Sequence, residues 1–198
     1  MKLEQLNLKK EFTFNYQEYL KLMEKLVAEN KTTGSVQTQE LADYTKMNLQ
    51  RMNRLNKTII LHGDLIHKAN AIQQAQTWIV ITETWCGDAA QNIPVIAHLA
   101  GANPKIELKL LLRDEHPEVM ENYLTNGGKS IPKLIAFDNE SGKELFVWGP
   151  RPESAQKLVL NYKNSDKKIP YNEFVKQVQL WYAKDATRSL QNELINLL

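Results

Sequence analysis

The stretch "TETWCGDAAQNIP", residues 82–94, decides how this chain is interpreted. It follows "TWIVIT" (77–82), an apolar, β-branched run without polar alternation, which is typical of a central strand covered on both faces. It continues into "AAQNIPVIAHLA" (89–100), which is helical in pattern and should kink near Pro94. The sequence therefore places Trp85 and Cys86 at a strand-to-helix turn.

Apolar spacing predicts the other elements. Before residue 59 the chain is predicted to be helical, over 14–30 and 38–55, with Gly34 available for a left-handed helix end. From residue 59 onward, strands and helices alternate. The expected strands are 58–61, 77–82, 106–112, 132–137 and 144–148, the last two joined as a hairpin by "DNESGK"; the expected helices are 64–74, 89–100, 117–126, 152–162 and 172–198.

Composition narrows the class of protein. The 198 residues are 42% apolar and 24% charged, as in a soluble globular protein, and the net charge of +2 comes from lysines scattered among carboxylates. This predicts no nucleic-acid partner. No stretch approaches a membrane span and the N-terminus lacks an apolar leader, so we expect a cytoplasmic protein. A single cysteine excludes an internal disulfide and a cysteine-rich metal site.

Three local signals lie in register on these elements. Trp85-Cys86-Gly87 follows the central strand, Pro94 lies eight residues after the cysteine, and Ser130-Ile131-Pro132 precedes the hairpin. Together they resemble the thioredoxin family, with its WCGPC turn, its proline in the following helix and its cis-proline loop. The resemblance implies an α/β fold, a thioredoxin-like βαβ-ββα sandwich, over residues 59–163. Residues 1–58 would form a helical extension packed on the core, and 164–198 a C-terminal helix.

The resemblance also implies roles for particular residues. Cys86 takes the place of the nucleophile. Pro132 would be a cis-proline beside the sulfur, and Ile131 would offer backbone groups to an extended substrate. Gly149 matches a small residue that leaves room for a bound peptide, and Trp85 would either face a substrate or cover the turn.

Departures from the family pattern limit the chemistry. Ala89 replaces the resolving cysteine, Asp88 replaces a proline, and Val80 replaces the buried carboxylate six residues before the nucleophile. The dithiol cycle of thioredoxin cannot run with one sulfur.

The surroundings of Cys86 should tune its thiol. The start of a helix at Gly87 favours a thiolate by about 0.3–1 kcal/mol, and repulsion from a carboxylate at Asp88 would oppose it by roughly the same amount. Asp88 has a second interpretation, as an acidic residue that merely stabilises the first helical turn. Arg151 could pair with Asp88, could hold the carboxylate of a small thiol, or could be a solvated arginine.

Three functions fit this pattern. In a monothiol oxidoreductase, Cys86 would form mixed disulfides with protein clients that carry a disulfide or an oxidised thiol, and an external low-molecular-weight thiol would resolve them. In a non-catalytic binding module, the cis-proline groove and the flanking helices would bind the partner. In an oxidant sensor, Cys86 would be capped reversibly. The four histidines predict no metal site, and no cofactor is expected.

Overall fold

The centre of the molecule is a mixed five-stranded sheet. The computed structural model describes residues 2–6, 8–166 and 168–198. The strands are β1 (Thr13–Phe14), β2 (Gln76–Thr82), β3 (Ile106–Leu112), β4 (Lys133–Asp138) and β5 (Glu144–Trp148), in the order β1-β3-β2-β4-β5. β2 pairs in parallel with β3 and antiparallel with β4, so the expected central position of 77–82 is confirmed.

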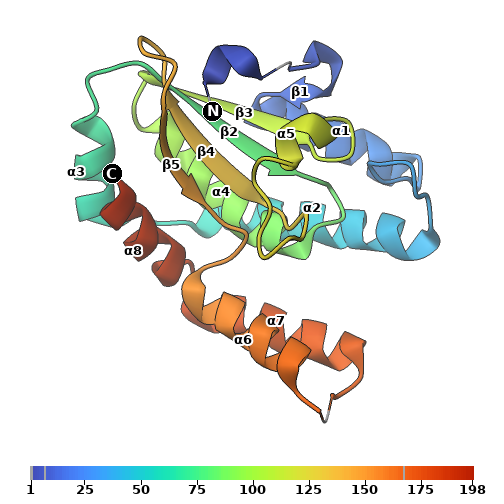
Figure 1. Cartoon of the computed structure of the whole chain (residues 1–198). Coiled ribbons are helices and arrows are strands. Elements are labelled where there is room, and N and C mark those ends of the chain that lie inside the picture. The colour runs from blue at the N-terminus through green and yellow to red at the C-terminus, as the bar shows by residue number, and fades with distance from the viewer. Residues whose placement is uncertain (1, 7, 167) are drawn as a thin grey trace.

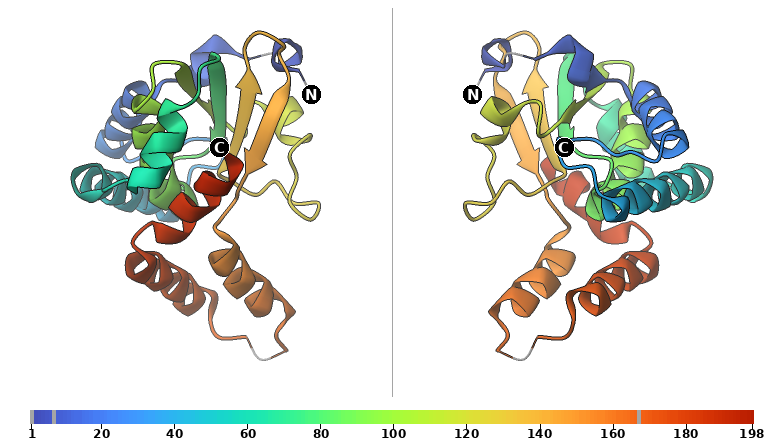
Figure 2. Two further views of the ribbon diagram at one scale, coloured as in Figure 1. Left: turned by 90° about the vertical axis from the view of Figure 1, so that its left-hand side faces the viewer. Right: turned by 90° about the vertical axis from the view of Figure 1, so that its right-hand side faces the viewer.

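Helices cover the sheet mainly on one face (Figures 1 and 2). The helices are α1 (Tyr16–Ala28), α2 (Gln39–Thr58), α3 (Gly63–Asn70), α4 (Gly87–Gly101), α5 (Pro117–Met120), α6 (Glu153–Asn164), α7 (Tyr171–Asp185) and α8 (Arg188–Leu197), with short 3₁₀ turns at Leu3–Gln5 and Lys10–Phe12. The helices α1 to α4 lie together on one side, α5 lies on the other, and α6 and α7 project as a hairpin from one end of the sheet (Figure 2). No helix within the described residues is long and apolar enough to cross a membrane.

The run without polar alternation is explained by burial on both faces. Residues Trp78, Ile79, Val80 and Ile81 of β2 are all fully buried. The Trp78 ring packs edge-on against Phe146 of β5, with ring centroids 5.7 Å apart. The prediction of a strand covered on both faces is confirmed.

The two predicted N-terminal helices form, with identifiable caps. Asn15 and Glu18 make a reciprocal capping box at the start of α1, and the Thr38 hydroxyl accepts the Leu41 N–H at the start of α2. The left-handed residue after α1 is Asn30 (φ 52°), whereas Gly34 (φ 83°) lies further along the connection. No pattern in the sequence indicates β1, a two-residue edge strand antiparallel to β3.

Two segments expected to be regular are not. The prediction of a strand at 58–61 is wrong, because Gln191 of α8 satisfies the backbone there. Its side chain accepts the His62 N–H at 2.7 Å and donates to the Ile60 carbonyl at 3.2 Å. The helix expected over 117–126 stops at Met120. Beyond it, the Tyr123 hydroxyl donates to Glu144 at 2.8 Å, which ties the irregular segment to the sheet edge.

The single C-terminal helix expected over 172–198 is two helices. Ala186 (φ 50°) and Thr187 (φ 68°) separate α7 from α8. The two helices bury their apolar residues in different places. Leu190 and Leu194 of α8 join the main core, whereas Phe174 and Val178 of α7, together with α6, form a smaller cluster. One continuous helix could not contribute to both clusters, so the chain turns between α7 and α8.

Candidate functional site

Cys86 caps the N-terminus of α4, directly beyond the end of β2. Its Sγ accepts the Ala89 N–H at 3.5 Å and donates to the Ile131 carbonyl at 3.4 Å. The Ile131–Pro132 peptide bond is cis, as expected. The Ile131 carbonyl accepts the thiol, so the loop before β4 lies against the sulfur. The structure thus brings together the cysteine turn and the cis-proline loop, and Pro94 lies within α4, the helix that Cys86 caps.

The thiol is held in its protonated form. Cys86 is 7% exposed, and burial raises the pKa of its thiol to about 12, with the Asp88 carboxylate acting in the same direction. The Ala89 N–H and the Arg151 guanidinium oppose this rise without cancelling it. At pH 7 a pKa of about 12 leaves roughly one thiol in 10⁵ ionised.

Asp88 is buried in a network that includes the C-terminal hairpin. Its carboxylate forms an ion pair with Arg151 at 2.6 Å and accepts a hydrogen bond from the Tyr182 hydroxyl at 2.9 Å. Arg151 is therefore the partner of Asp88, one of the three arrangements considered from the sequence, and is not a solvated residue. Burial raises the pKa of Asp88, and Arg151 counteracts the rise. Tyr182 lies 94 residues from Asp88, and no local pattern in the sequence pointed to it.

The backbone conformation and close surroundings of Gly149 require a glycine. Its φ is 113°, and a Cβ built on it would overlap the carbonyl oxygen of Pro132. Its own carbonyl accepts the Lys133 ammonium at 2.9 Å. The absent side chain thus lets β5 approach the cis-proline loop. Room for a bound peptide remains a prediction.

Trp85 is half-buried beside the thiol. The guanidinium carbon of Arg113 lies 5.0 Å from its ring centroid, within the range of a cation–π contact. Trp85 also borders the cavity described below, so it both covers the turn and reaches the solvent-accessible space.

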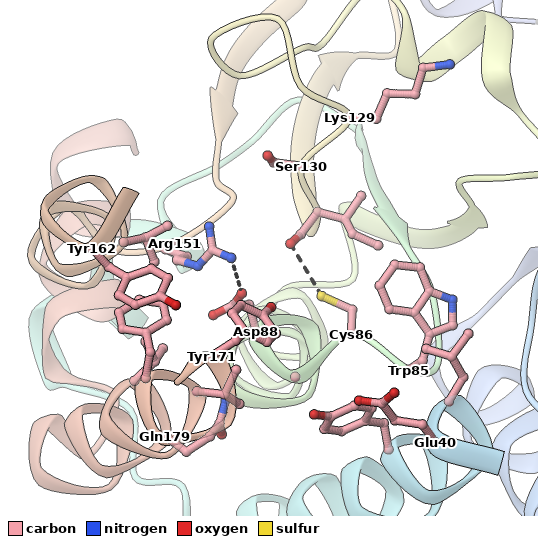
Figure 3. Close-up of a pocket in the computed structure, with 18 of the residues that line it drawn as sticks. Glu40, Trp85, Cys86, Asp88, Lys129, Ser130, Arg151, Tyr162, Tyr171 and Gln179 are labelled. Carbon is pink, nitrogen blue, oxygen red and sulfur yellow. Dashed lines mark hydrogen bonds and ion pairs between the residues drawn. The ribbon is translucent and has the colours of Figure 1, made fainter. Parts of the chain in front are cut away.

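A cavity of about 530 Å³ opens onto the cysteine (Figure 3). Trp85, Cys86, Gly87 and Asp88 border it, as do Ile131 and Arg151. Arg113, Lys129 and Ser130 also line it, and the rest of its wall comes from helices outside the expected active-site turn. These are residues of α2 such as Tyr44, of α6 such as Tyr162, and of α7 such as Tyr171 and Gln179. The side chain of Ala89 is fully inside the protein, and Pro132 does not line the cavity.

The site also contains a buried carboxylate that the sequence analysis did not predict. Glu83, three residues before the cysteine, is fully buried, and burial raises its pKa to about 7. Its Oε1 accepts the Asp114 N–H at 2.9 Å, while Oε2 has no hydrogen-bond partner among the described residues. The sequence signal that could have indicated this buried carboxylate is an acidic residue directly after an apolar strand. No group of histidine, cysteine and acidic side chains that could hold a metal ion exists among the described residues.

Comparison with known proteins agrees with this geometry. A family model described as Thioredoxin matches residues 34–183. No curated protein matches the chain. Among solved structures, PA1234 of Pseudomonas aeruginosa, a protein of unknown function, is 15% identical with a TM-score of 0.55, covering 93% of this chain and 96% of that chain. An HIV epitope scaffold is 14% identical with a TM-score of 0.55, covering 93% of this chain and 97% of that chain.

The two structural matches establish the shared fold, and the family model spans most of the sequence, α2 and the α6–α7 hairpin included. The expected thioredoxin-like α/β fold is confirmed. The chain belongs to the thioredoxin family and carries a single buried cysteine in the turn between β2 and α4.

Proposed function

We propose that the protein is a monothiol thiol–disulfide oxidoreductase with Cys86 as its nucleophile. The observation that carries this proposal is the position of Sγ. It lies at the start of a 15-residue helix, beside the cis-proline loop, and on the wall of a cavity. Ala89 stands where a second thiol would have to be, so resolution needs a thiol from outside the chain.

The two steps balance without any further oxidant. In the first, the sulfur of Cys86 attacks a disulfide R–S–S–R, forming Cys86–S–S–R and releasing R–S⁻, which takes up the proton that the cysteine lost. In the second, an external thiol R′–SH attacks the R sulfur of the mixed disulfide, so that R–S–S–R′ leaves and Cys86 recovers its proton.

The raised pKa sets the rate of the unassisted reaction. Against an ordinary cysteine of pKa about 8.5, a pKa of about 12 lowers the thiolate fraction roughly 3,000-fold. The more basic thiolate is also the stronger nucleophile, which recovers a factor of about 40 at a Brønsted slope near 0.45. Cys86 should therefore react roughly 100-fold more slowly than a free cysteine, unless a substrate in the cavity changes its surroundings.

The same observation supports a second candidate, a non-catalytic binding module. A thiol that is buried and donates to the Ile131 carbonyl is a stable structural group in its own right. In that case the cavity would bind its ligand with Cys86 as a wall residue.

Mass spectrometry of the native protein separates the two candidates. We expect incubation with a neutral aromatic disulfide, dithiodipyridine, to add one thiopyridine group to the wild type and none to Cys86→Ser, and a reducing thiol should remove it. The oxidoreductase proposal is wrong if the native protein stays unmodified up to about pH 10 while the urea-unfolded protein reacts at once.

A further inference from the structure

The cavity at Cys86 has the size and the boundaries of a small-molecule site. Its volume of about 530 Å³ falls within the roughly 300–1,000 Å³ of typical ligand pockets. The turn and the cis-proline loop form one part of the wall, α2 a second part, and the α6–α7 hairpin a third (Figure 3). The Ile131 carbonyl, which would serve an extended substrate, is engaged by the Cys86 thiol. Helices thus border the space next to the sulfur.

The wall carries an excess of cationic side chains. Five bordering residues are basic, namely Arg51, Arg113, Lys129, Arg151 and Lys163, and two are acidic, namely Glu40 and Asp88.

Ion pairs engage three of the five cations. Arg151 pairs with Asp88, Arg113 with Asp114, and Lys129 with Glu121. Within residues 2–6, 8–166 and 168–198, no acidic side chain forms an ion pair with Arg51 or Lys163. Arg51 is half-buried and donates to the Asn48 side chain at 2.9 Å, which orients it beside Gly87. Arg51 on α2 and Lys163 on α6 are therefore available to a negatively charged ligand.

Aromatic rings supply much of the apolar part of the same wall. Tyr44, Trp85, Tyr162, Tyr171 and Phe174 all border the cavity. Tyr162 stacks on Phe174 with ring centroids 3.9 Å apart and planes 7° from parallel, so these two rings present a fixed surface. Such rings offer stacking faces to a planar or apolar ligand group.

We propose that this cavity selects a low-molecular-weight, anionic disulfide as the reaction partner of Cys86, with Arg51 and Lys163 recognising its negative charge. This inference rests on the proposed function, because the ligand is the R–S–S–R of the exchange reaction. The sulfur attacks one disulfide sulfur, and the other leaves as an anionic small thiol that takes up the proton. A small thiol of the same kind then resolves the mixed disulfide.

A charge series of disulfides tests the selection. The probes are dithiobis(nitrobenzoate), which is an aromatic dianion, dithiodipyridine, which is aromatic and neutral, and cystamine, which is a dication. The rate constant for Cys86 is divided by that of a free cysteine with the same probe. We expect the normalised rate to be highest for the dianion, to saturate with its concentration, and to be lowest for the dication.

A pair of matched variants tests whether the charge selection comes from the cavity. Arg51→Gln/Lys163→Gln removes two charges from the cavity, and Lys46→Gln/Lys176→Gln removes two exposed charges from α2 and α7 outside it. We expect the ratio of the rate with the dianion to the rate with the neutral probe to fall about tenfold in the cavity variant and less than twofold in the control variant. Equal losses in the two variants, or equal normalised rates for all three probes, would overturn the anionic selection.

Calorimetry with Cys86→Ser distinguishes a failure of this inference from a failure of the proposed function. The serine protein cannot exchange, so any heat with dithiobis(nitrobenzoate) reports binding alone. Binding that weakens in the Arg51→Gln/Lys163→Gln background supports the anionic site, even if the wild type proves unreactive with every probe. No binding to the serine protein overturns the anionic site, even if the wild type exchanges with the neutral probe.

Discussion

Replacing Asp88 by asparagine should release the thiol of Cys86. Asparagine keeps the size of the side chain and can still accept from Tyr182, but it removes a buried negative charge that raises the pKa of Cys86. It also leaves the Arg151 guanidinium without its partner, and that cation lowers the pKa of the thiol.

The size of the effect follows from Coulomb's law. For an assumed separation of about 6 Å between the two charges and an effective dielectric of about 20–40, the interaction is roughly 1.4–2.8 kcal/mol. This corresponds to a decrease of about 1–2 pK units. We therefore expect the pKa of Cys86 to fall from about 12 to about 10–11, and its ionised fraction at neutral pH to rise about 10- to 100-fold.

The measurement is the pH dependence of alkylation by iodoacetamide, a neutral reagent whose access is not altered by the charge change. Asp64→Asn, an exposed residue in the first turn of α3, is the matched control and should leave the profile unchanged. A wild-type midpoint near 8.5, or an Asp88→Asn midpoint equal to that of the wild type, would refute the reasoning that burial and Asp88 together suppress the thiolate.

Three further predictions concern stability. Arg151→Gln leaves Asp88 buried without its cation, so we expect the free energy of unfolding in urea to fall by about 3 kcal/mol at pH 7. The loss should shrink at low pH, where Asp88 is protonated in both the folded and the unfolded protein. A loss that does not change with pH would contradict this account. Gly149→Ala combines a positive φ with overlap on the Pro132 carbonyl, and should cost at least about 2 kcal/mol by the same assay; a neutral effect would mean that β5 can move away. Glu83 has a pKa of about 7 when folded, above the unfolded value of about 4.3, so the native state binds more protons between these values. Stability should fall as the pH rises from about 4.3 to about 7, by about 3 kcal/mol from this group, and Glu83→Gln should flatten that slope in a pH series of urea titrations.

The parts of the fold that sequence reasoning predicted are those whose signals are local. The apolar run of β2, the glycine-containing hairpin before β5 and the spacing of α2 each reflect contacts that a whole element makes in a repeating pattern. A two-residue strand such as β1 has no period to detect. The segment 58–61 has strand-like composition, but a side chain from α8, about 130 positions away, satisfies its backbone.

In the site, too, local sequence signals were predictive and long-range contacts were not. The turn, the cysteine and the cis-proline loop are each marked by a few adjacent residues, and the pairing of Arg151 with Asp88 could be considered because both flank elements of that core. Tyr182, Arg51 and Lys163 could not be assigned, because only the packing of α7, α2 and α6 brings them to the turn or to the cavity beside it. Glu83 lies three residues beyond Val80, the position at which the resemblance implies a buried carboxylate, so the family pattern does not point to it.

Asp88 links the chemistry of the turn to the helices around it. Asp88 is a carboxylate buried next to a thiol, at the position where the family has proline. Burying that charge is energetically costly unless a cation and a hydrogen-bond donor contact it, and Arg151 and Tyr182 do so. Tyr182 can reach it only because α7 packs beside α4, which also makes the hairpin a wall of the cavity. The substitution that suppresses the thiol and the helices that enclose it are therefore two aspects of one arrangement. A ligand that displaced Arg151 from Asp88 would alter the charge beside Cys86 at the moment of binding, so occupancy of the cavity and reactivity of the sulfur should be coupled.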